Sequence, residues 1–201
     1  MLDDMNQRLP RVHGLDALGQ QDVSCPNDLM SRWPVISNSE HVYTPPRTLA
    51  ANEVPPALLN YLNGRDLLLK TQAIRLSTVD VDGWPRAALL SAGDVLALPN
   101  GRIRFAIFAN SGTTANLLRD GRLTLSMALD GGMYSLRMRA RQCGQVTGEA
   151  PLAFFETQVE RARLHVASYA DVSCGISFSL HEPATVLDRW ERQIAALRAV
   201  S

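Results

Sequence analysis

The sequence predicts a mainly β fold of the α+β class, in which an antiparallel sheet curls toward a barrel and helices flank it. Two observations in the middle of the chain favour this fold. Apolar and polar residues alternate with period two over several consecutive segments, and short turn signals separate these segments. Period two indicates antiparallel strands. A sheet of this length with short connections tends to close on itself, because closure removes its unpaired edges.

Three turn signals mark the ends of the expected strands. They are Asp82-Gly83, Asn100-Gly101 and the run 130–132, each flanked by alternating segments. Asp-Gly and Asn-Gly supply the positive φ angles that tight hairpins require. The residues that alternation assigns to a single face in two of these strands are Ile103, Phe105 and Ile107, and then Leu123, Leu125, Met127 and Leu129.

Helices are expected before, between and after these strands. A proline suits the first turn of a helix, Ser111 can cap one, and Gly121 can end it. The expected helices cover residues 55–64, 111–121, 151–168 and 185–200, and a last strand with Ile176, Phe178 and Leu180 inward covers residues 174–182.

The chain divides into two parts by composition. Residues 1–50 contain five prolines and no sustained hydrophobic period, so we expect an irregular N-terminal extension there. Residues 51–201 are expected to form the barrel domain with its C-terminal helix.

Charge and hydropathy exclude several classes of partner. The chain has 20 Lys and Arg against 20 Asp and Glu, a net charge of zero, which argues against nucleic acid or an anionic membrane as main partner. The polar N-terminus does not resemble a secretory signal, and no apolar run reaches the ~20 residues that span a bilayer. We therefore expect a cytoplasmic protein.

The common catalytic and metal-binding signatures are missing from the sequence. It contains no GxSxG, GxGxxG, Walker or HExxH motif, and its four histidines are far apart. No catalytic residue is predicted, and no metal site.

A hydroxyl-rich run opens the helix that begins near Ser111. Thr113 and Thr114 follow it closely, and Asn116 lies one turn further on. The free N–H groups of a helix N-terminus attract anions, and hydroxyls add donors. The run therefore predicts either a phosphate-binding corner or an ordinary capped helix.

A stripe of arginines follows on one of the later strands. Arg137, Arg139 and Arg141 alternate, so they share one face, and Arg86 lies on an earlier strand. Guanidiniums in a row repel one another unless solvent or an anion separates their charges. The stripe indicates either a solvated outer face or part of a phosphate pocket.

The order of these motifs resembles the FMN-binding split barrel of the pyridoxamine 5′-phosphate oxidase-like superfamily. The matching motifs are the strand GWPRAALL at residues 83–90, the strand end FAIFANS at 105–111, the helix TTANLLRDGR at 113–122, and the strands RLTLSMAL and YSLRMRARQ that follow. The resemblance covers residues 55–150 well and the segment to about 182 loosely. It implies an antiparallel split β-barrel with flanking helices.

The resemblance also implies a homodimer with two FMN molecules at the subunit interface. Arg86, Ser111 and Thr113 would hold the phosphate, with Thr114 and Asn116 close by. The flavin ring would lie against strand backbone, and Arg137 and Arg139 would line the ring or come from the partner subunit. The complete set of expected cofactor-binding residues is Arg86, Ala88, Leu90, Asn110, Ser111, Thr113, Thr114, Asn116, Arg137 and Arg139.

Two departures from the superfamily pattern narrow the expected function. Gly112-Thr113 stand where true oxidases carry an Arg-Lys pair, and the chain lacks their C-terminal arginine- and histidine-bearing motif. Vitamin B6 oxidation is therefore not predicted.

The prediction is an FMN-binding oxidoreductase, of the flavin-reductase type, whose substrate is open. Two alternatives remain on the same barrel. One is a deazaflavin- or haem-binding protein, with His165 or His181 as the axial haem ligand. The other is a non-catalytic dimeric binding or sensor module.

Overall fold

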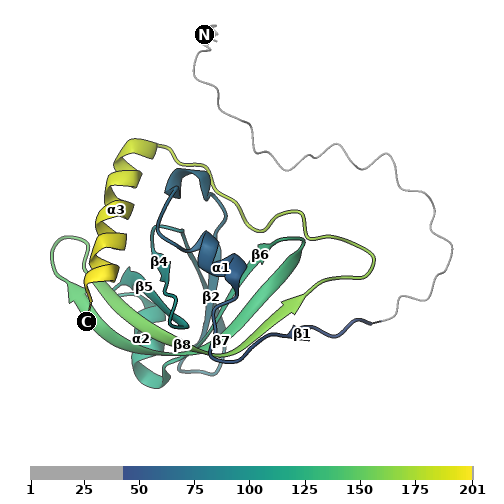
Figure 1. Cartoon of the computed structure of the whole chain (residues 1–201). Helices are drawn as coiled ribbons and strands as arrows, with labels where there is room; N and C mark the ends of the chain where they lie inside the picture. Colours follow the sequence, from purple (N-terminus) through teal and green to yellow (C-terminus); the bar gives the residue numbers. More distant parts are fainter. Residues whose placement is uncertain (1–42, 201) are drawn as a thin grey trace, which may run out of the picture. The chain divides into compact units, whose positions relative to one another are not determined.

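The computed structural model describes residues 43–200, which form one curled antiparallel sheet with flanking helices (Figure 1). The strands follow the order β3-β2-β6-β7-β8-β5-β4, with β1 paired to β8. The elements are β1 (Arg47–Thr48), α1 (Pro56–Tyr61), the 3₁₀ turn η2 (Leu67–Leu69), β2 (Ile74–Val79), β3 (Pro85–Leu90), β4 (Val95–Ala97), β5 (Arg102–Phe108), α2 (Gly112–Asp120), β6 (Arg122–Leu129), β7 (Gly132–Val146), β8 (Leu152–His165) and α3 (Pro183–Ala199). The predicted fold class is confirmed.

The two edge strands of the sheet are neighbours in the chain. β3 and β4 stand at opposite ends of the strand order, yet only residues 91–94 join them. The sheet must therefore curl until its edges approach each other at this turn. Ser91 fixes the turn, because its N–H and hydroxyl donate to the Asp94 carboxylate at 2.8 Å and 2.5 Å. This curling produces the half-barrel that an alternating pattern with short turns predicts.

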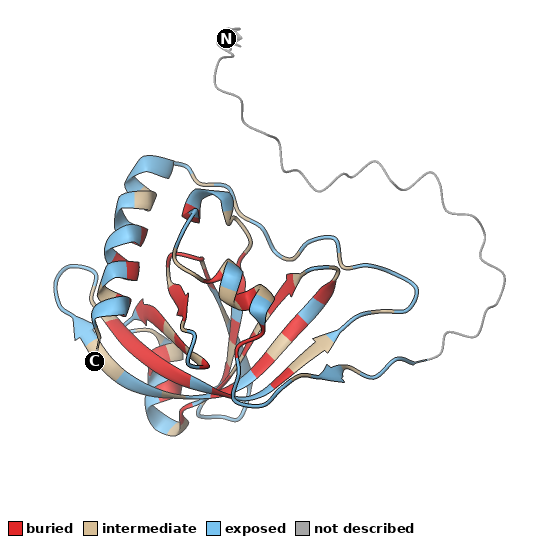
Figure 2. Cartoon of the chain, in the orientation of Figure 1, coloured by how far each residue is buried: buried red, intermediate tan, exposed pale blue. Residues whose placement is uncertain are grey.

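Two clusters of buried apolar residues hold the sheet and its helices together. Figure 2 marks the buried positions along the strands and on α3. The larger one fills the inside of the curl, where Phe105 and Phe155 stack with ring centroids 5.5 Å apart. The smaller one lies under α3 and includes Phe154 and Trp190. Trp190 packs over Gly93, where a Cβ atom would come within 2.0 Å of its ring. α3 thus lies close against the turn that joins the two edges.

The expected turns and most expected elements are confirmed. Gly83, Gly101 and Gly131 all have positive φ, as tight hairpins require. Helices form in three of the predicted segments, residues 55–64, 111–121 and 185–200, although α1 ends at Tyr61. Of the predicted N-terminal extension, residues 1–42 lie outside the described part of the chain, and Arg47–Thr48 pair with β8.

The prediction of a helix over residues 151–168 was wrong, because this segment forms β8. Phe155, Thr157 and Val159 face the inside of the curl, but Phe154 is also buried, under α3. Burial on both faces produces adjacent apolar residues, which hide the period-two pattern. β7 is 15 residues long and pairs with β8 along its length, so tertiary pairing decides the outcome.

The predicted last strand over residues 174–182 was also wrong. This segment makes only an isolated bridge between Ser177 and Gln72. Ile176 is 56% exposed, whereas Phe178 packs edge-on against Trp190 at 6.3 Å between ring centroids. The segment is therefore an extended connection that leads to α3. Its apolar residue Phe178 packs against another side chain and does not belong to a strand of the sheet.

Candidate functional site

The start of α2 is a tightly hydrogen-bonded corner at the end of β5. Ser111 is the N-cap residue, and its hydroxyl oxygen accepts a hydrogen bond from the Thr114 N–H at 3.2 Å. The Thr114 hydroxyl donates to the Phe108 carbonyl at 2.8 Å, and the Ser111 N–H donates to the same carbonyl at 3.1 Å. These bonds join the last residue of β5 to the first turn of α2 and fix the corner's backbone.

Two of the predicted cofactor residues are used inside the protein. Thr114 is 3% exposed and Asn116 is 7% exposed. The Asn116 side-chain amide donates to the Thr78 hydroxyl at 3.0 Å, which attaches α2 to β2. In this structure, therefore, Thr114 and Asn116 hold the corner in place rather than point out of it.

The first turn of α2 leaves donors that are not used by the fold. The N–H groups of Gly112 and Thr113, like the Thr113 hydroxyl, have no hydrogen-bond partner among the described residues. A Cβ atom placed on Gly112 would meet nothing within 4 Å, so space lies open above this turn. Asn110 is exposed next to it. The corner can therefore accept an anion at its N–H groups.

Three predicted residues form a row on the edge strand β3. Arg86, Ala88 and Leu90 pair with Thr78, Leu76 and Ile74 of β2, so their side chains share the face that α2 covers. Exposure decreases along the row, from Arg86, whose side chain is 68% accessible, to Leu90, which is buried. Arg86 makes one loose ion pair, at 4.0 Å, with Asp80. Its guanidinium is thus available on the same side of the sheet as the first turn of α2.

The arginine stripe of β7 lies at the other end of α2. Arg139 donates to the carbonyl of Asp120, the last residue of α2, at 3.4 Å. Nine helical residues rise by about 13 Å, so Arg139 is well separated from Ser111. Arg137 is exposed on the outer face of β7. In the described chain, therefore, Arg86 lies on the face of the sheet where Asn116 of α2 contacts Thr78, whereas Arg137 and Arg139 lie apart from the corner.

The structure adds a charged cluster on the outer face that the sequence analysis missed. Glu156 of β8 is 4% exposed and forms ion pairs with Arg102, Arg104 and Arg141 at 3.0, 2.9 and 2.7 Å. Burial alone would raise the pKa of Glu156. Hydrogen bonds from Arg104 and Arg141 and the charge of Arg102 outweigh it and hold the pKa below its ordinary value. The sequence does contain a signal for this cluster, the alternating arginines of RIRF at 102–105 and RMRAR at 137–141. The cluster was missed because residue 156 was predicted to lie in a helix.

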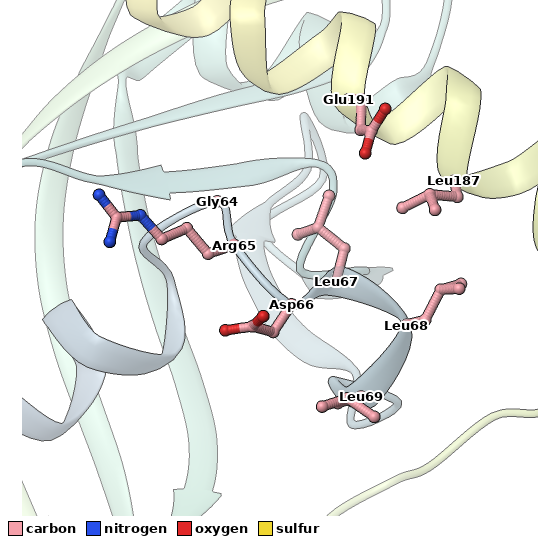
Figure 3. A pocket seen from close by; sticks show the side chains of 8 residues that line it. All are labelled: Gly64, Arg65, Asp66, Leu67, Leu68, Leu69, Leu187 and Glu191. Atoms are coloured by element: carbon pink, nitrogen blue, oxygen red, sulfur yellow. The ribbon is translucent and has the colours of Figure 1, made fainter.

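A separate hollow of about 260 Å³ lies between residues 64–69 and α3 (Figure 3). Leu67, Leu68 and Leu187 lie around it, and the side chain of Arg65 points away from them (Figure 3). None of the residues predicted to bind the cofactor lines this hollow. It is therefore not part of the corner at Ser111.

Neither a metal-binding cluster nor a buried histidine gives a second candidate site in the described residues. Residues 43–200 contain no group of three or more His, Cys, Asp or Glu side chains that could hold a metal ion. His165 and His181, the candidate haem ligands, are both exposed. No helix in the described part of the chain is long and apolar enough to cross a membrane.

Comparison with known proteins identifies a relative over most of the chain. The chain is 32% identical over 152 residues to the uncharacterized protein YclD of Bacillus subtilis strain 168, covering 75% of this chain and 99% of YclD. The chain belongs to the YclD family. No protein-family model matches it. The aligned length of the relative corresponds closely to the length of the curled-sheet unit.

Several solved structures are similar to parts of the chain at low identity. One, described as a candidate pyridoxamine 5′-phosphate oxidase from Lactobacillus delbrueckii, is 18% identical, with a TM-score of 0.44 over 57% of this chain and 97% of that one. An FMN-binding protein from Syntrophomonas wolfei is 18% identical, with a TM-score of 0.36 over 51% and 89%. An F420 reductase is 13% identical, with a TM-score of 0.38 over 48% and 92%.

Proposed function

We propose that this chain is an FMN-binding oxidoreductase of the pyridoxamine 5′-phosphate oxidase-like superfamily. The cofactor phosphate would bind at the first turn of α2, and the flavin ring would lie along β3. The observation that carries the proposal is the position of Arg86. Its side chain is exposed, and among the described residues it makes only a 4.0 Å ion pair. It lies on the same face of the sheet as the N–H groups of Gly112 and Thr113, which have no hydrogen-bond partner in residues 43–200.

The groups at this corner suit a phosphate. Two backbone N–H groups, one hydroxyl and one guanidinium are the donors that phosphates accept from in proteins. These groups also replace part of the positive charge that the Arg-Lys pair supplies in true oxidases. Arg86 supplies one positive charge, and the positive end of the α2 dipole supplies a partial one. The internal bonds of Ser111 and Thr114 keep these donors in place before the ligand binds.

The edge strand suits the polar edge of a flavin ring. Among the described strands, β3 pairs with β2 on one side only, so its other side presents backbone N–H and C=O groups without strand partners in residues 43–200. These groups match the carbonyls and N–H of the ring. Phe108, 55% exposed at the end of β5, offers an apolar surface beside the corner. The chain would thus bind the phosphate at one end and orient the ring at the other.

The residues of the corner bind and orient rather than transfer protons. Neither a threonine hydroxyl nor a guanidinium titrates near neutral pH, so neither is a general acid or base. A bound flavin would supply the two-electron chemistry itself. This division of roles favours hydride transfer over hydrolysis, and it leaves the substrate to be found by experiment.

Flavin binding is the direct test. We expect natively purified protein, or protein incubated with FMN, to show a flavin absorption band and to quench FMN fluorescence. Arg86→Gln and Gly112→Ala should each weaken FMN binding about tenfold, which corresponds to about 1.4 kcal/mol. The first removes the positive charge, and the second places a methyl group in the open space above the turn.

Arg189→Gln is the matched control, because Arg189 is an exposed arginine on α3, outside the corner. It should change the FMN dissociation constant less than twofold. A thermal shift series with FMN, deazaflavin and haem separates the alternatives, since a ligand of the folded state raises the melting temperature. No response to FMN, together with a response to deazaflavin or haem, would contradict the proposal. No response to any of the three would favour the non-catalytic binding module.

A further inference from the structure

A second charged hollow lies on the outer face of the sheet, away from the corner at Ser111. It has a volume of about 410 Å³ and is lined by residues of β5, β7 and β8. The side chains that line it from the outer face are Arg102, Arg139, Arg141, Glu156, Gln158 and Glu160. We call this hollow the outer groove. Its volume is in the range of small-molecule sites in proteins.

The strand register places the charged side chains of the outer groove in two cross-strand rows. Arg102, Gln158 and Arg139 are paired across β5, β8 and β7 in the first row. Arg104, Glu156 and Arg141 are paired across the same strands in the second. Paired residues on neighbouring strands point to the same face. The guanidiniums therefore converge from both sides on the central strand.

Two irregularities in the β7–β8 ladder bracket the groove. Register shifts occur between Arg137 and Met138 and between Gln142 and Gly144. The first adds Glu160 to the outer face, where its carboxylate pairs with Arg139 at 3.3 Å. Bulges redirect side chains and recur next to functional sites. Arg139 and Arg141 lie between the two shifts.

Positive charge exceeds negative charge in this cluster. Among the described residues, Arg102, Arg104, Arg139 and Arg141 form ion pairs with two carboxylates, those of Glu156 and Glu160, which leaves two more positive than negative charges in these pairs. Three of the four arginines share the one buried carboxylate of Glu156. Like charges on adjacent strands repel one another. A dianion in the groove would remove this excess.

The arginines differ in how many donors the fold uses. Arg104 is 11% exposed and is fully engaged, because it also donates to the Leu197 and Val200 carbonyls at the end of α3. Arg102 and Arg141 are 43% and 66% exposed, and each donates a single hydrogen bond, to Glu156. A guanidinium has five N–H donors, so most of theirs have no partner among the described residues. Glu156 fixes the guanidiniums of Arg102 and Arg141 in position.

We propose that the outer groove is a binding site for a small phosphorylated molecule, whose phosphate lies between the guanidiniums of Arg102 and Arg141. Forked N–H donors match phosphate oxygens, and a phosphate dianion balances the two excess charges. The groove exceeds the volume of a bare phosphate, so the remainder of the ligand would lie along the arginine stems. Arg102 and Arg141, which would hold this phosphate, are not among the residues predicted to bind FMN, and the groove shares only Arg139 with that set.

The test measures binding of inorganic phosphate to the full chain by calorimetry, at constant ionic strength set with chloride. We expect Arg102→Gln and Arg141→Gln each to weaken phosphate binding at least tenfold. Arg189→Gln, an exposed arginine on α3, should change it less than twofold. Equal phosphate affinity in the wild type and in both groove variants would overturn the proposal.

Two further measurements distinguish the groove from the α2 corner and from misfolding. In the first, phosphate binding is measured again with FMN at saturation. Retained phosphate binding supports the groove, whereas its loss would assign the phosphate to the α2 corner and overturn the proposal. If FMN does not bind, the groove variants still decide the question on their own. Circular dichroism checks the fold of each variant. If Arg141→Gln does not fold, Arg141→Lys replaces it, with at least a fivefold loss expected because an ammonium lacks the fork.

Discussion

Glu156 is the residue on which the charges of the outer face depend. Its buried carboxylate holds three guanidiniums, and one of them, Arg104, is itself nearly buried. We expect Glu156→Gln to lower the free energy of unfolding by about 3 kcal/mol at neutral pH, because it leaves buried positive charge without a counter-ion. Urea unfolding of both proteins measures the difference. Glu160→Gln is the control. That carboxylate is 54% exposed, so the loss should stay below about 0.5 kcal/mol.

The same carboxylate predicts a pH dependence with a defined sign. Because the Glu156 pKa in the folded protein lies below its ordinary value, the folded state favours the ionised form. The stabilisation is complete above the ordinary pKa of a glutamate in the unfolded chain and is lost as the pH falls through the lower folded pKa. Unfolding curves at pH 7, 5 and 3 should show the wild type and Glu156→Gln converging at the acid end. A difference independent of pH would rule out this origin.

At the scale of elements, the sequence predicts α2 and the strands around it well, because local signals and tertiary structure agree there. Ser111 and Gly121 mark the ends of α2, and the glycine turns mark the hairpins. β8 could not be predicted in the same way. Its helix-like spacing of Phe154, Phe155 and Val159 arises because α3 covers one face and the core covers the other. The pairing of Glu156 with arginines from two other strands was hidden for the same reason.

The C-terminal end of α2 offers a matched pair of glycine substitutions. Gly121 has φ +72°, and a Cβ there would lie 2.8 Å from the Ala140 carbonyl oxygen. Gly121→Ala should therefore lower the free energy of unfolding by more than about 1 kcal/mol. Gly112→Ala, in the first turn of the same helix, should be neutral or stabilising by up to about 1 kcal/mol, since its Cβ meets nothing within 4 Å. Thermal unfolding distinguishes the two, and equal losses would contradict the role of Gly121.

At the scale of the whole molecule, the proposed cofactor site is linked to the homodimer that the sequence resemblance implies. Large apolar side chains are exposed on and near the edge strand β3 and at the end of β5. They are Val81, Trp84, Leu89 and Phe108, with exposed fractions of 79%, 71%, 54% and 55%. Exposed apolar surface of this kind is typical of protein interfaces. A dimer through this edge would cover the open side of β3, where the flavin ring is proposed to lie.

The dimer proposal gives a test that connects assembly to cofactor binding. Light scattering should give about twice the chain mass of 22.1 kDa. Trp84→Ala should weaken the dimer by about 2 kcal/mol or more, roughly thirtyfold in the dissociation constant, because exposed tryptophans are frequent interface anchors. Leu69→Ala, at an 84% exposed leucine in η2, should leave the dimer unchanged. If the cofactor lies at the subunit interface, Trp84→Ala must also weaken FMN binding at low protein concentration, and raising the protein concentration must restore it. FMN affinity independent of protein concentration would place the whole cofactor site within one subunit.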